Sequence, residues 1–198
     1  MPVARSSAFL LILLAVGCGG HKILVPPRLD LKPYGKVGLV TFTVENATGS
    51  LQQFATERFS EEILAAQPGV EVLELGPLDG ELDAARAQQL GKDKGVAAVF
   101  AGHLKVTNPT PGGGISSLLT PHLEATIRLD LSVRLLATSS GGTVWRSSAW
   151  ATQKVGQVSL VGGVLNFEAR DPKAAYGPLV NRLIQLVGQD MWSTWQQQ

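Results

Sequence analysis

One segment of the chain, residues 123–135, alternates strictly between apolar and polar side chains. Its odd-numbered positions are all apolar, and its even-numbered positions are all polar or charged (LEATIRLDLSVRL). Because successive side chains of a β-strand point to opposite faces of a sheet, this pattern predicts a long strand with one buried and one solvated face. Such strands are typical of antiparallel sheets that pack on a core through one face. The fold must therefore contain a sheet that is covered on the apolar side of this strand.

Other segments also have strand patterns. Residues 37–44 (VGLVTFTV) are apolar on both faces and rich in β-branched side chains, which predicts a central strand covered on both sides. Residues 70–75 are expected to form a short second strand. Residues 96–107 are expected to form a third strand. Its even-numbered positions from Val96 to Val106 are apolar or glycine and share one face. Residues 143–152 follow a two-glycine turn and are expected to form a strand next to the alternating one.

Two early segments have helical patterns. Ser50 and Gln53 form a capping-box pattern, apolar residues then recur at helical spacing, and a Pro-Gly pair ends the helix. Asp79 is predicted to cap a second helix that continues through Leu90. These helices are expected to cover one face of the sheet together.

A third helix is expected at the end of the chain. It opens at Asp171-Pro172 and is predicted to run to about Trp195. Trp195 continues its apolar stripe and is therefore predicted to lie in the core, whereas the position of Trp192 is left open. Pro178 is predicted to kink the first turns or to mark the true start of the helix. The element order is thus β-α-β-α-β-β-β-α with a hairpin before the last helix, which indicates a single compact α+β domain with a mixed sheet.

The N-terminus has the pattern of an export signal. Arg5 is the only charged residue of segment 1–20, and residues 8–16 (AFLLILLAV) are apolar. This run is about half of the roughly 20 residues that a membrane-spanning helix needs. We therefore expect a cleaved signal peptide rather than a permanent transmembrane helix.

Residues 15–18 (AVGC) resemble the lipobox of bacterial lipoproteins, in which small residues precede a cysteine. The resemblance implies cleavage before Cys18, diacylation of its thiol and acylation of the new amino group, so that lipid on Cys18 holds the chain on a membrane. Gly19 favours the periplasmic face of the outer membrane, because Asp at that position commonly signals retention in the inner membrane. The alternative is an ordinary secretory signal with an incidental cysteine.

These patterns divide the chain into three parts. Residues 1–17 are the expected lipoprotein signal peptide. Residues 18–34 contain glycine and proline without a periodic pattern and are expected to form a flexible tether. Residues 35–198 are the expected α+β periplasmic domain.

Three short motifs resemble one group of bacterial envelope proteins. Residues 45–49 (ENATG) resemble their "N-x-T-G" opening, residues 95–102 (GVAAVFAG) their "G-V-D-x-V-x-x-G" strand, and residues 141–145 (GGTVW) their "T-G-x-x-V-W" turn. The group includes the curli-secretion channel lipoprotein, the lipoprotein activators of penicillin-binding proteins and the amino-terminal domain of the Tol–Pal translocation protein. Ala97 stands where an acidic residue is frequent, which leaves the subfamily open. The resemblance implies a non-enzymatic role in envelope assembly, secretion or export.

Composition and motifs exclude several other functions. The formal net charge of +1 does not favour nucleic-acid binding. His21, His103 and His122 have no further ligand at metal-binding spacing, so neither a metal nor a cofactor is expected. No G-x-S-x-G, H-E-x-x-H or Walker-type loop occurs, which predicts no catalytic residues. The alternating charges of Glu124, Arg128, Asp130 and Arg134 are interpreted as a solvated sheet face, with a polar partner surface as the alternative.

Two uncharged segments, residues 107–122 and 155–167, are left to assign. The second contains a predicted hairpin about Gly162-Gly163, in which Leu160 faces Leu165 and Ser159 faces Asn166. The apolar face of this hairpin is the candidate partner-binding site, and it consists of Val158, Leu160, Leu165 and Phe167. The hairpin is expected to fold onto its own sheet, to bind a neighbouring subunit or another envelope protein, or to touch lipid.

The sequence therefore predicts a binding or assembly factor of envelope biogenesis or secretion. It is expected to be held at the outer membrane by lipid on Cys18 and to bind another envelope protein or copies of itself. The alternative is a ring-forming or pore-forming subunit of an export system. Neither uncharged segment supplies the two strands of about 9–11 residues that a membrane-spanning hairpin requires.

Overall fold

The computed structural model describes residues 21–47, 50–111, 125–155, 159–161, 164–166 and 172–197. Its strands are β1 (Lys22–Val25), β2 (Lys36–Val40), β3 (Thr43–Glu45), β4 (Glu71–Gly76), β5 (Ala98–Pro111), β6 (Ala125–Ala137), β7 (Thr143–Val155), β8 (Ser159–Val161), β9 (Val164–Asn166) and β10 (Thr194–Gln197). Its α-helices are α1 (Leu51–Ala66), α2 (Ala84–Lys94) and α3 (Pro172–Gly188), and short 3-10 helices lie at Lys32–Tyr34 and Gln189–Met191. The fold is α+β, as predicted.

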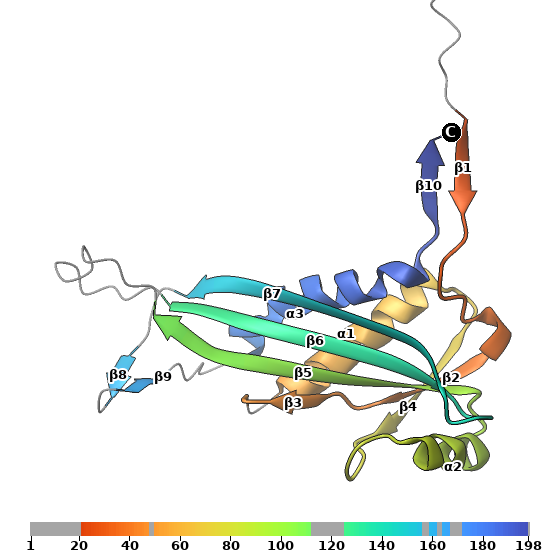
Figure 1. Cartoon of the computed structure of the whole chain (residues 1–198), viewed down its shortest axis with the longest axis horizontal. Coiled ribbons are helices and arrows are strands. Elements are labelled where there is room, and N and C mark those ends of the chain that lie inside the picture. Colours follow the sequence, from red (N-terminus) through yellow and green to blue (C-terminus); the bar gives the residue numbers. More distant parts are fainter. Residues whose placement is uncertain are drawn as a thin grey trace, which may run out of the picture.

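The central sheet of the described residues has six strands in the order β4-β2-β5-β6-β7, with β3 paired to β5 beyond the end of β2 (Figure 1). β2 is parallel to both β4 and β5, whereas β5, β6 and β7 form antiparallel pairs. The sheet is therefore mixed. Residues 37–44, which were predicted as one strand, are divided between β2 and β3 by Thr41 and Phe42.

The main core lies between the sheet and the helices α1 and α3, which pack together on one face (Figure 1). The predicted alternation of β6 is confirmed over residues 127–135, where the odd-numbered side chains are all buried on this face: Ile127, Leu129, Leu131, Val133 and Leu135. Aromatic rings cross the core at centroid distances of 5.3 Å for Phe42–Phe59, 5.3 Å for Phe59–Phe100 and 6.0 Å for Phe100–Trp145. These contacts connect α1 to β5 and β7.

The helix α2 covers one end of the opposite face. Its residue Ala87 is buried together with Val99 of β5 and Leu136 of β6 in a second, smaller cluster. The prediction that the two early helices share one face is therefore wrong. The connection from β2 to β4 contains α1, and the connection from β4 to β5 contains α2 and runs across the sheet in the opposite direction. Since both connections are right-handed crossovers, opposite directions place the two helices on opposite faces of the sheet.

The segment 21–34 is folded, which differs from the predicted tether at 18–34. It contains β1 and a 3-10 helix, and Leu29 and Leu31 are buried in the main core. The folded part of the chain therefore begins before Gly35. Glycine and proline in this segment indicated a linker, but two leucines provide enough apolar surface to fix it on the domain.

The last helix ends earlier than predicted. α3 begins at Pro172, as expected, contains Pro178, and stops at Gly188 before a 3-10 turn. The chain then forms β10, which pairs with β1 in a two-stranded antiparallel ribbon (Figure 1). Trp195 lies in β10 and is exposed, so the prediction that it belongs to the core is wrong. The turn breaks the helical phase on which that prediction depended.

Two predicted helix caps also differ. Ser50 precedes α1, but its side chain makes no capping hydrogen bond, and Gln53 donates to Glu57 Oε1 at 2.8 Å instead. The N-cap of α2 is Asp83, whose Oδ1 accepts a hydrogen bond of 2.8 Å from the backbone N–H of Arg86. Asp79 therefore does not start this helix. The helix continues past Leu90 to Lys94, where a left-handed glycine ends it.

The predicted hairpin is present as the pair β8–β9. Leu160 lies opposite Leu165 and Ser159 opposite Asn166, which confirms the predicted register. Val158 and Phe167, the outer members of the candidate partner-binding face, lie outside the described residues, as does Cys18. No helix in the described part of the chain is long and apolar enough to cross a membrane.

Candidate functional site

Beyond α2, no helix of the described residues covers the outer face of β3, β5, β6 and β7 (Figure 1). We call this surface the open face. The alternation that buries one side of each strand places polar side chains here in rows across the sheet. The open face consists of Thr43, Glu45, His103, Lys105, Arg128, Asp130, Ser132, Arg134, Arg146, Ser148 and Trp150.

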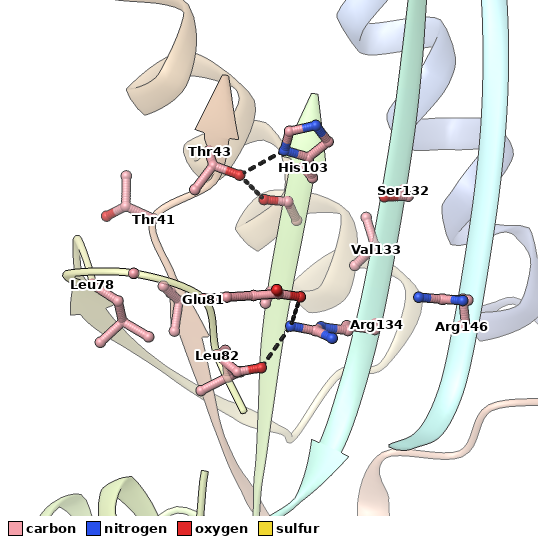
Figure 2. Close-up of a pocket in the computed structure, with 14 residues that line it drawn as sticks. Thr41, Thr43, Leu78, Glu81, Leu82, His103, Ser132, Val133, Arg134 and Arg146 are labelled. Atoms are coloured by element: carbon pink, nitrogen blue, oxygen red, sulfur yellow. Dashed lines mark hydrogen bonds and ion pairs between the residues drawn. The ribbon is translucent and has the colours of Figure 1, made fainter. Parts of the chain in front are cut away.

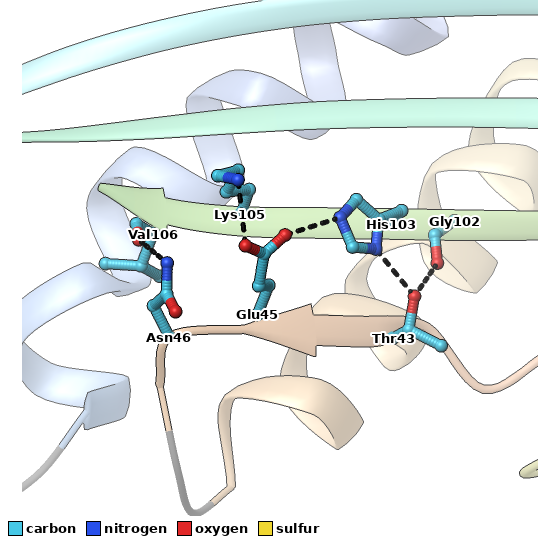
Figure 3. A network of polar contacts seen from close by, with 7 residues as sticks. All are labelled: Thr43, Glu45, Asn46, Gly102, His103, Lys105 and Val106. Carbon is cyan, nitrogen blue, oxygen red and sulfur yellow. Dashed lines mark hydrogen bonds and ion pairs between the residues drawn. The ribbon is translucent and has the colours of Figure 1, made fainter. Parts of the chain in front are cut away.

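One row alternates in charge across three strands. Glu45 of β3 lies opposite Lys105 of β5, which lies opposite Asp130 of β6. Lys105 Nζ contacts Glu45 Oε1 at 2.8 Å, and Asp130 Oδ1 accepts from Arg128 Nη2 at 2.6 Å (Figure 3 shows the first pair). These ion pairs are exposed, so each contributes little to stability. They confirm that Arg128 and Asp130 belong to a solvated sheet face, as predicted, whereas Glu124 of the same predicted row lies outside the described residues.

His103 connects β3 to β5. Its Nδ1 lies 2.9 Å from Thr43 Oγ1, and its Nε2 lies 3.5 Å from Glu45 Oε2 (Figure 3). Within the described residues, no group of three or more His, Cys, Asp or Glu side chains is placed to hold a metal ion. His103 is therefore a polar contact between neighbouring strands.

Ion pairing shifts two pKa values on the open face. The hydrogen bond from Lys105 lowers the pKa of Glu45 below its ordinary value of 4.5, against the opposing effect of desolvation. The hydrogen bond to Asp130 raises the pKa of Arg128 above its ordinary value. Both groups are therefore held in their charged forms at neutral pH.

A cavity of about 590 Å³ lies at the end of the open face that is nearest α2. Its floor is the sheet, and one wall is the loop from Leu78 to Leu82 that precedes α2 (Figure 2). The side chains of Thr41, Thr43 and Ser132 supply hydroxyl groups to its lining. The cavity combines these hydrogen-bonding groups with arginine side chains.

Two arginines meet at this cavity. Arg134 of β6 and Arg146 of β7 occupy directly opposite positions in the antiparallel pair and point to the same face. Arg134 Nη2 donates to Glu81 Oε1 at 2.9 Å and to the carbonyl oxygen of Leu82 at 2.5 Å (Figure 2). Like charges in opposed positions destabilise a sheet. The two arginines therefore do not stabilise the fold by facing each other, and this makes them candidates for a functional role.

Arg146 has no such compensation. It is exposed, and no carboxylate among the described residues lies within ion-pair distance of its guanidinium. Lys105, Arg128 and Arg134 each have a carboxylate partner. Arg146 therefore leaves the open face with an unbalanced positive charge, and a carboxylate or phosphate group is the ligand that such a site accepts best.

The open face also carries an aromatic side chain. Trp150 lies opposite Asp130 and is 60% exposed. The guanidinium carbon of Arg128 lies 4.7 Å from the centroid of its ring, in a cation–π contact. A second, smaller hollow connects Trp150 to His103 and Lys105 along the same face.

Sequence reasoning identified only part of this site. It assigned Arg128, Asp130 and Arg134 to a polar face and weighed a partner surface there, but it did not single out Arg146 or Glu81. Glu81 comes from the loop before α2, whose contact with β6 is not visible in a linear pattern. The alternation of polar and apolar residues in β7 could have placed Arg146 on the polar face. The opposition of Arg146 and Arg134 could not be predicted, because it depends on the structure of the turn between β6 and β7.

No protein-family model and no curated protein matches the chain. Among solved structures, it is similar to PelC from Paraburkholderia phytofirmans, which was solved as a dodecamer, with 16% identity over 86% of this chain and 96% of that chain and a TM-score of 0.46. A lipoprotein from Neisseria meningitidis is 18% identical over 61% of this chain and 83% of that chain, with a TM-score of 0.39. The C-terminal domain of LpoB from Escherichia coli is 16% identical over 60% of this chain and 84% of that chain, with a TM-score of 0.37. These likenesses are distant, so the site is interpreted from the chain's own residues.

Proposed function

We propose that the chain is a lipid-anchored envelope protein of the periplasmic face of the outer membrane that binds a partner protein through the open face of its sheet. It acts as a binding or assembly factor and not as an enzyme. The lipobox resemblance at residues 15–18 supports the anchor on Cys18. The open face supports the binding role.

The observation that carries this proposal is the opposition of Arg134 and Arg146 at the edge of a cavity. Since Glu81 already neutralises Arg134, the guanidinium of Arg146 remains for an acidic group of the partner. A carboxylate that enters the cavity gains a charge-assisted hydrogen bond and relieves the repulsion between the two arginines. The hydroxyl groups in the lining provide further donors.

Trp150 favours a protein over a small molecule as the partner. It lies on the same face as Arg146, four residues further along β7, and most of its surface is exposed. Tryptophan and arginine are the side chains that most often dominate the binding energy of protein interfaces. An acidic segment with an apolar side chain matches this pair, whereas a small anion would use Arg146 alone.

Site-specific photo-crosslinking tests the binding role. A photoreactive residue replaces Ser148, which lies between Arg146 and Trp150 on β7, in the mature lipoprotein of living cells. We expect a discrete adduct with a partner or with a second copy of the chain, and Arg146→Glu should reduce its yield several-fold. Arg182→Glu on α3, an exposed arginine on the other side of the sheet, is the matched control. An adduct yield that responds equally to both substitutions would contradict the proposal.

The anchor is tested separately with Cys18→Ser. This substitution removes the thiol that the lipobox resemblance identifies as the lipid attachment site. We expect it to abolish the incorporation of labelled palmitate and to release the chain from the membrane fraction. Continued labelling and membrane fractionation of the variant would show that the anchor is wrong.

A further inference from the structure

The β1–β10 ribbon extends away from the rest of the domain (Figure 1). It consists of four residue pairs, from Lys22–Gln197 at its tip to Val25–Thr194 at its base. An isolated two-stranded ribbon of this length is marginally stable in water, and both of its strands are edge strands. Its geometry therefore suggests a surface that is covered in the working protein.

One face of the ribbon is amphipathic. Directly opposed residues of an antiparallel pair point to the same side, so Leu24 and Trp195 share a face with Lys22 and Gln197. Leu24 is 54% exposed and Trp195 is 68% exposed, the largest exposed fraction among the exposed large hydrophobic side chains of the described residues. The apolar pair lies toward the base of the ribbon, and the Lys22 cation lies at its tip. Large apolar side chains exposed together normally mark a contact surface.

The nearby Trp192 differs from Trp195. Its Nε1 donates to Glu62 Oε1 of α1 at 2.6 Å, which holds the indole ring against the domain. No hydrogen bond fixes the indole of Trp195 to any described residue. The two tryptophans are three residues apart, and only Trp195 is carried out on the ribbon.

The position of the lipid anchor decides what covers the ribbon. β1 begins at Lys22, four residues after Cys18. Even a fully extended chain spans at most about 14 Å over this separation. If Cys18 carries acyl chains, the tip of the ribbon is therefore held within about 14 Å of the lipid headgroups. A partner protein that covered the ribbon would have to fit into this narrow space between the domain and the membrane.

We propose that the β1–β10 ribbon lies in the headgroup region of the bilayer and inserts Trp195 and Leu24 at the membrane interface, with Lys22 near the lipid phosphates. The inference rests on the proposed lipid anchor at Cys18. Tryptophan is enriched at this interface because its ring is apolar while its N–H can still reach a hydrogen-bond acceptor. A lysine next to anionic lipid adds a further favourable interaction. The ribbon thus gives the domain a fixed face toward the membrane.

Fluorescence quenching by brominated lipids tests the inference independently of acylation in the cell. The chain from Cys18 onward contains all described residues, and Cys18 is its only cysteine. Its thiol can therefore be coupled to a maleimide headgroup in vesicles of phosphatidylethanolamine and phosphatidylglycerol with brominated acyl chains. The chain has four tryptophans, so Trp195→Phe is compared with Trp150→Phe, which removes an exposed tryptophan from the open face.

We expect brominated lipid to quench the coupled protein, Trp195→Phe to remove more than half of this quenching, and Trp150→Phe to leave it unchanged. Leu24→Asp should reduce the quenching of Trp195 without changing the circular dichroism spectrum, because the side chain of Leu24 is exposed. Equal quenching in both tryptophan variants would overturn the inference. So would protection of Trp195 from iodide in the uncoupled chain together with a doubled mass in light scattering, because a second copy would then cover the ribbon.

Mass spectrometry of the N-terminal peptide, taken from the protein in its native membrane, shows whether Cys18 is acylated. This measurement distinguishes a failure of the ribbon contact from a failure of the proposed lipid anchor. Acyl chains on Cys18 without quenching of Trp195 would refute the ribbon contact and leave the anchor standing. Quenching of Trp195 in coupled vesicles without acyl chains on the native peptide would refute the anchor and leave the affinity of the ribbon for lipid.

Discussion

The side-chain oxygen of Gln67 accepts a hydrogen bond of 3.1 Å from the backbone N–H of Leu31, across 36 positions of sequence. The amide nitrogen of the same side chain donates to the carbonyl oxygens of Leu29 at 3.0 Å and Met191 at 2.7 Å. Gln67 is only 2% exposed. One buried amide at the end of α1 therefore joins the N-terminal segment to the turn that follows α3.

Replacement of Gln67 by Leu should lower the free energy of unfolding by about 3 kcal/mol, because it leaves the N–H of Leu31 and the carbonyl groups that Gln67 satisfies without partners, at about 1–3 kcal/mol for a buried group. Urea unfolding measures this change. Gln53→Leu is the matched control, since Gln53 is exposed and bonds only to Glu57. A loss in Gln67→Leu no larger than in Gln53→Leu would show that these hydrogen bonds contribute nothing.

The two faces of β6 should respond differently to truncation. Leu131 is 1% exposed in the main core, so Leu131→Ala should cost about 2–5 kcal/mol of stability. Ser132 is the next residue and lies on the open face, and Ser132→Ala should change the stability by less than about 0.5 kcal/mol. Thermal unfolding of both variants checks the difference. Similar shifts would be incompatible with the observed alternation.

Gly102 leaves room for the ring of Phe42. A Cβ at position 102 would lie 2.4 Å from two ring carbons of Phe42, whose side chain is fully buried. Gly102→Ala should therefore destabilise the fold by about 1–3 kcal/mol through overpacking. In Gly102→Ala with Phe42→Leu, the smaller side chain should relieve part of this cost, so that the double variant is more stable than the two single effects predict. Gly177→Ala on α3 is the control, because a Cβ there would meet its nearest atom, a ring carbon of Phe54, at an ordinary contact distance of 3.6 Å.

The side chain of Arg146 is expected to lower the stability of the fold. Arg146→Ala should raise the free energy of unfolding slightly, by about 0.2–1 kcal/mol, because it removes a like charge opposite Arg134. Arg134→Ala should instead lower it, because Arg134 holds the loop at Glu81 and Leu82. Denaturant titrations at low and high salt measure both effects, and the gain in Arg146→Ala should shrink at high salt. A loss of stability in Arg146→Ala would indicate a structural role for this side chain.

The attachment of β3 should weaken in acid. Lys105 lowers the pKa of Glu45, so the folded form binds a proton less readily than the unfolded form does. The resulting stabilisation is present above pH 4.5 and is lost as the pH falls through the lowered pKa of the folded state. The protection factors of the β3 amides, which correct for the pH dependence of intrinsic amide exchange, should therefore fall in acid, whereas Glu45→Gln should lower them already at neutral pH. Identical exchange in both proteins at neutral pH would argue against a role for this ion pair.

The strands of the central sheet were predictable because their patterns are local. In β5 and β6, residues such as Phe100 and Leu129 mark the buried face at every second position, and the structure confirms this face. The opposite placement of α1 and α2 was not predictable in the same way. It depends on β2 lying between β4 and β5, and no periodicity within one element records the order of strands in a sheet.

The ribbon and the end of α3 were missed because long-range contacts determine them. Leu24 pairs with Trp195 across almost the whole chain, and strands this short have no alternation to reveal them. The apolar stripe of α3 continues past Gly188, but Asp190 accepts hydrogen bonds from the backbone N–H of Leu29 and from Trp145 Nε1. These tertiary contacts favour the 3-10 turn over a further helical turn.

The proposed binding site was only partly predictable for a similar reason. The polar side of β6 was evident, but the residue opposite Arg134 depends on a bulge between Leu135 and Leu136. A bulge shifts the pairing by one residue, and its position is set by the turn and by packing rather than by the alternation itself. The opposition of Arg134 and Arg146 therefore became visible only in the folded chain.

A pulling force applied at the N-terminal end of β1 would run along the strand into the domain. β1 passes from Lys22 at its tip to Val25 at its base, and the chain then enters the core at Leu29 and Leu31. The hydrogen bonds between β1 and β10 lie across this line, so a displacement of β1 along its axis would have to shear them together. Mechanical tension would therefore be resisted first by the ribbon and then by the buried side chains of Leu29 and Leu31, which must leave the core before the domain can unravel from its N-terminal side.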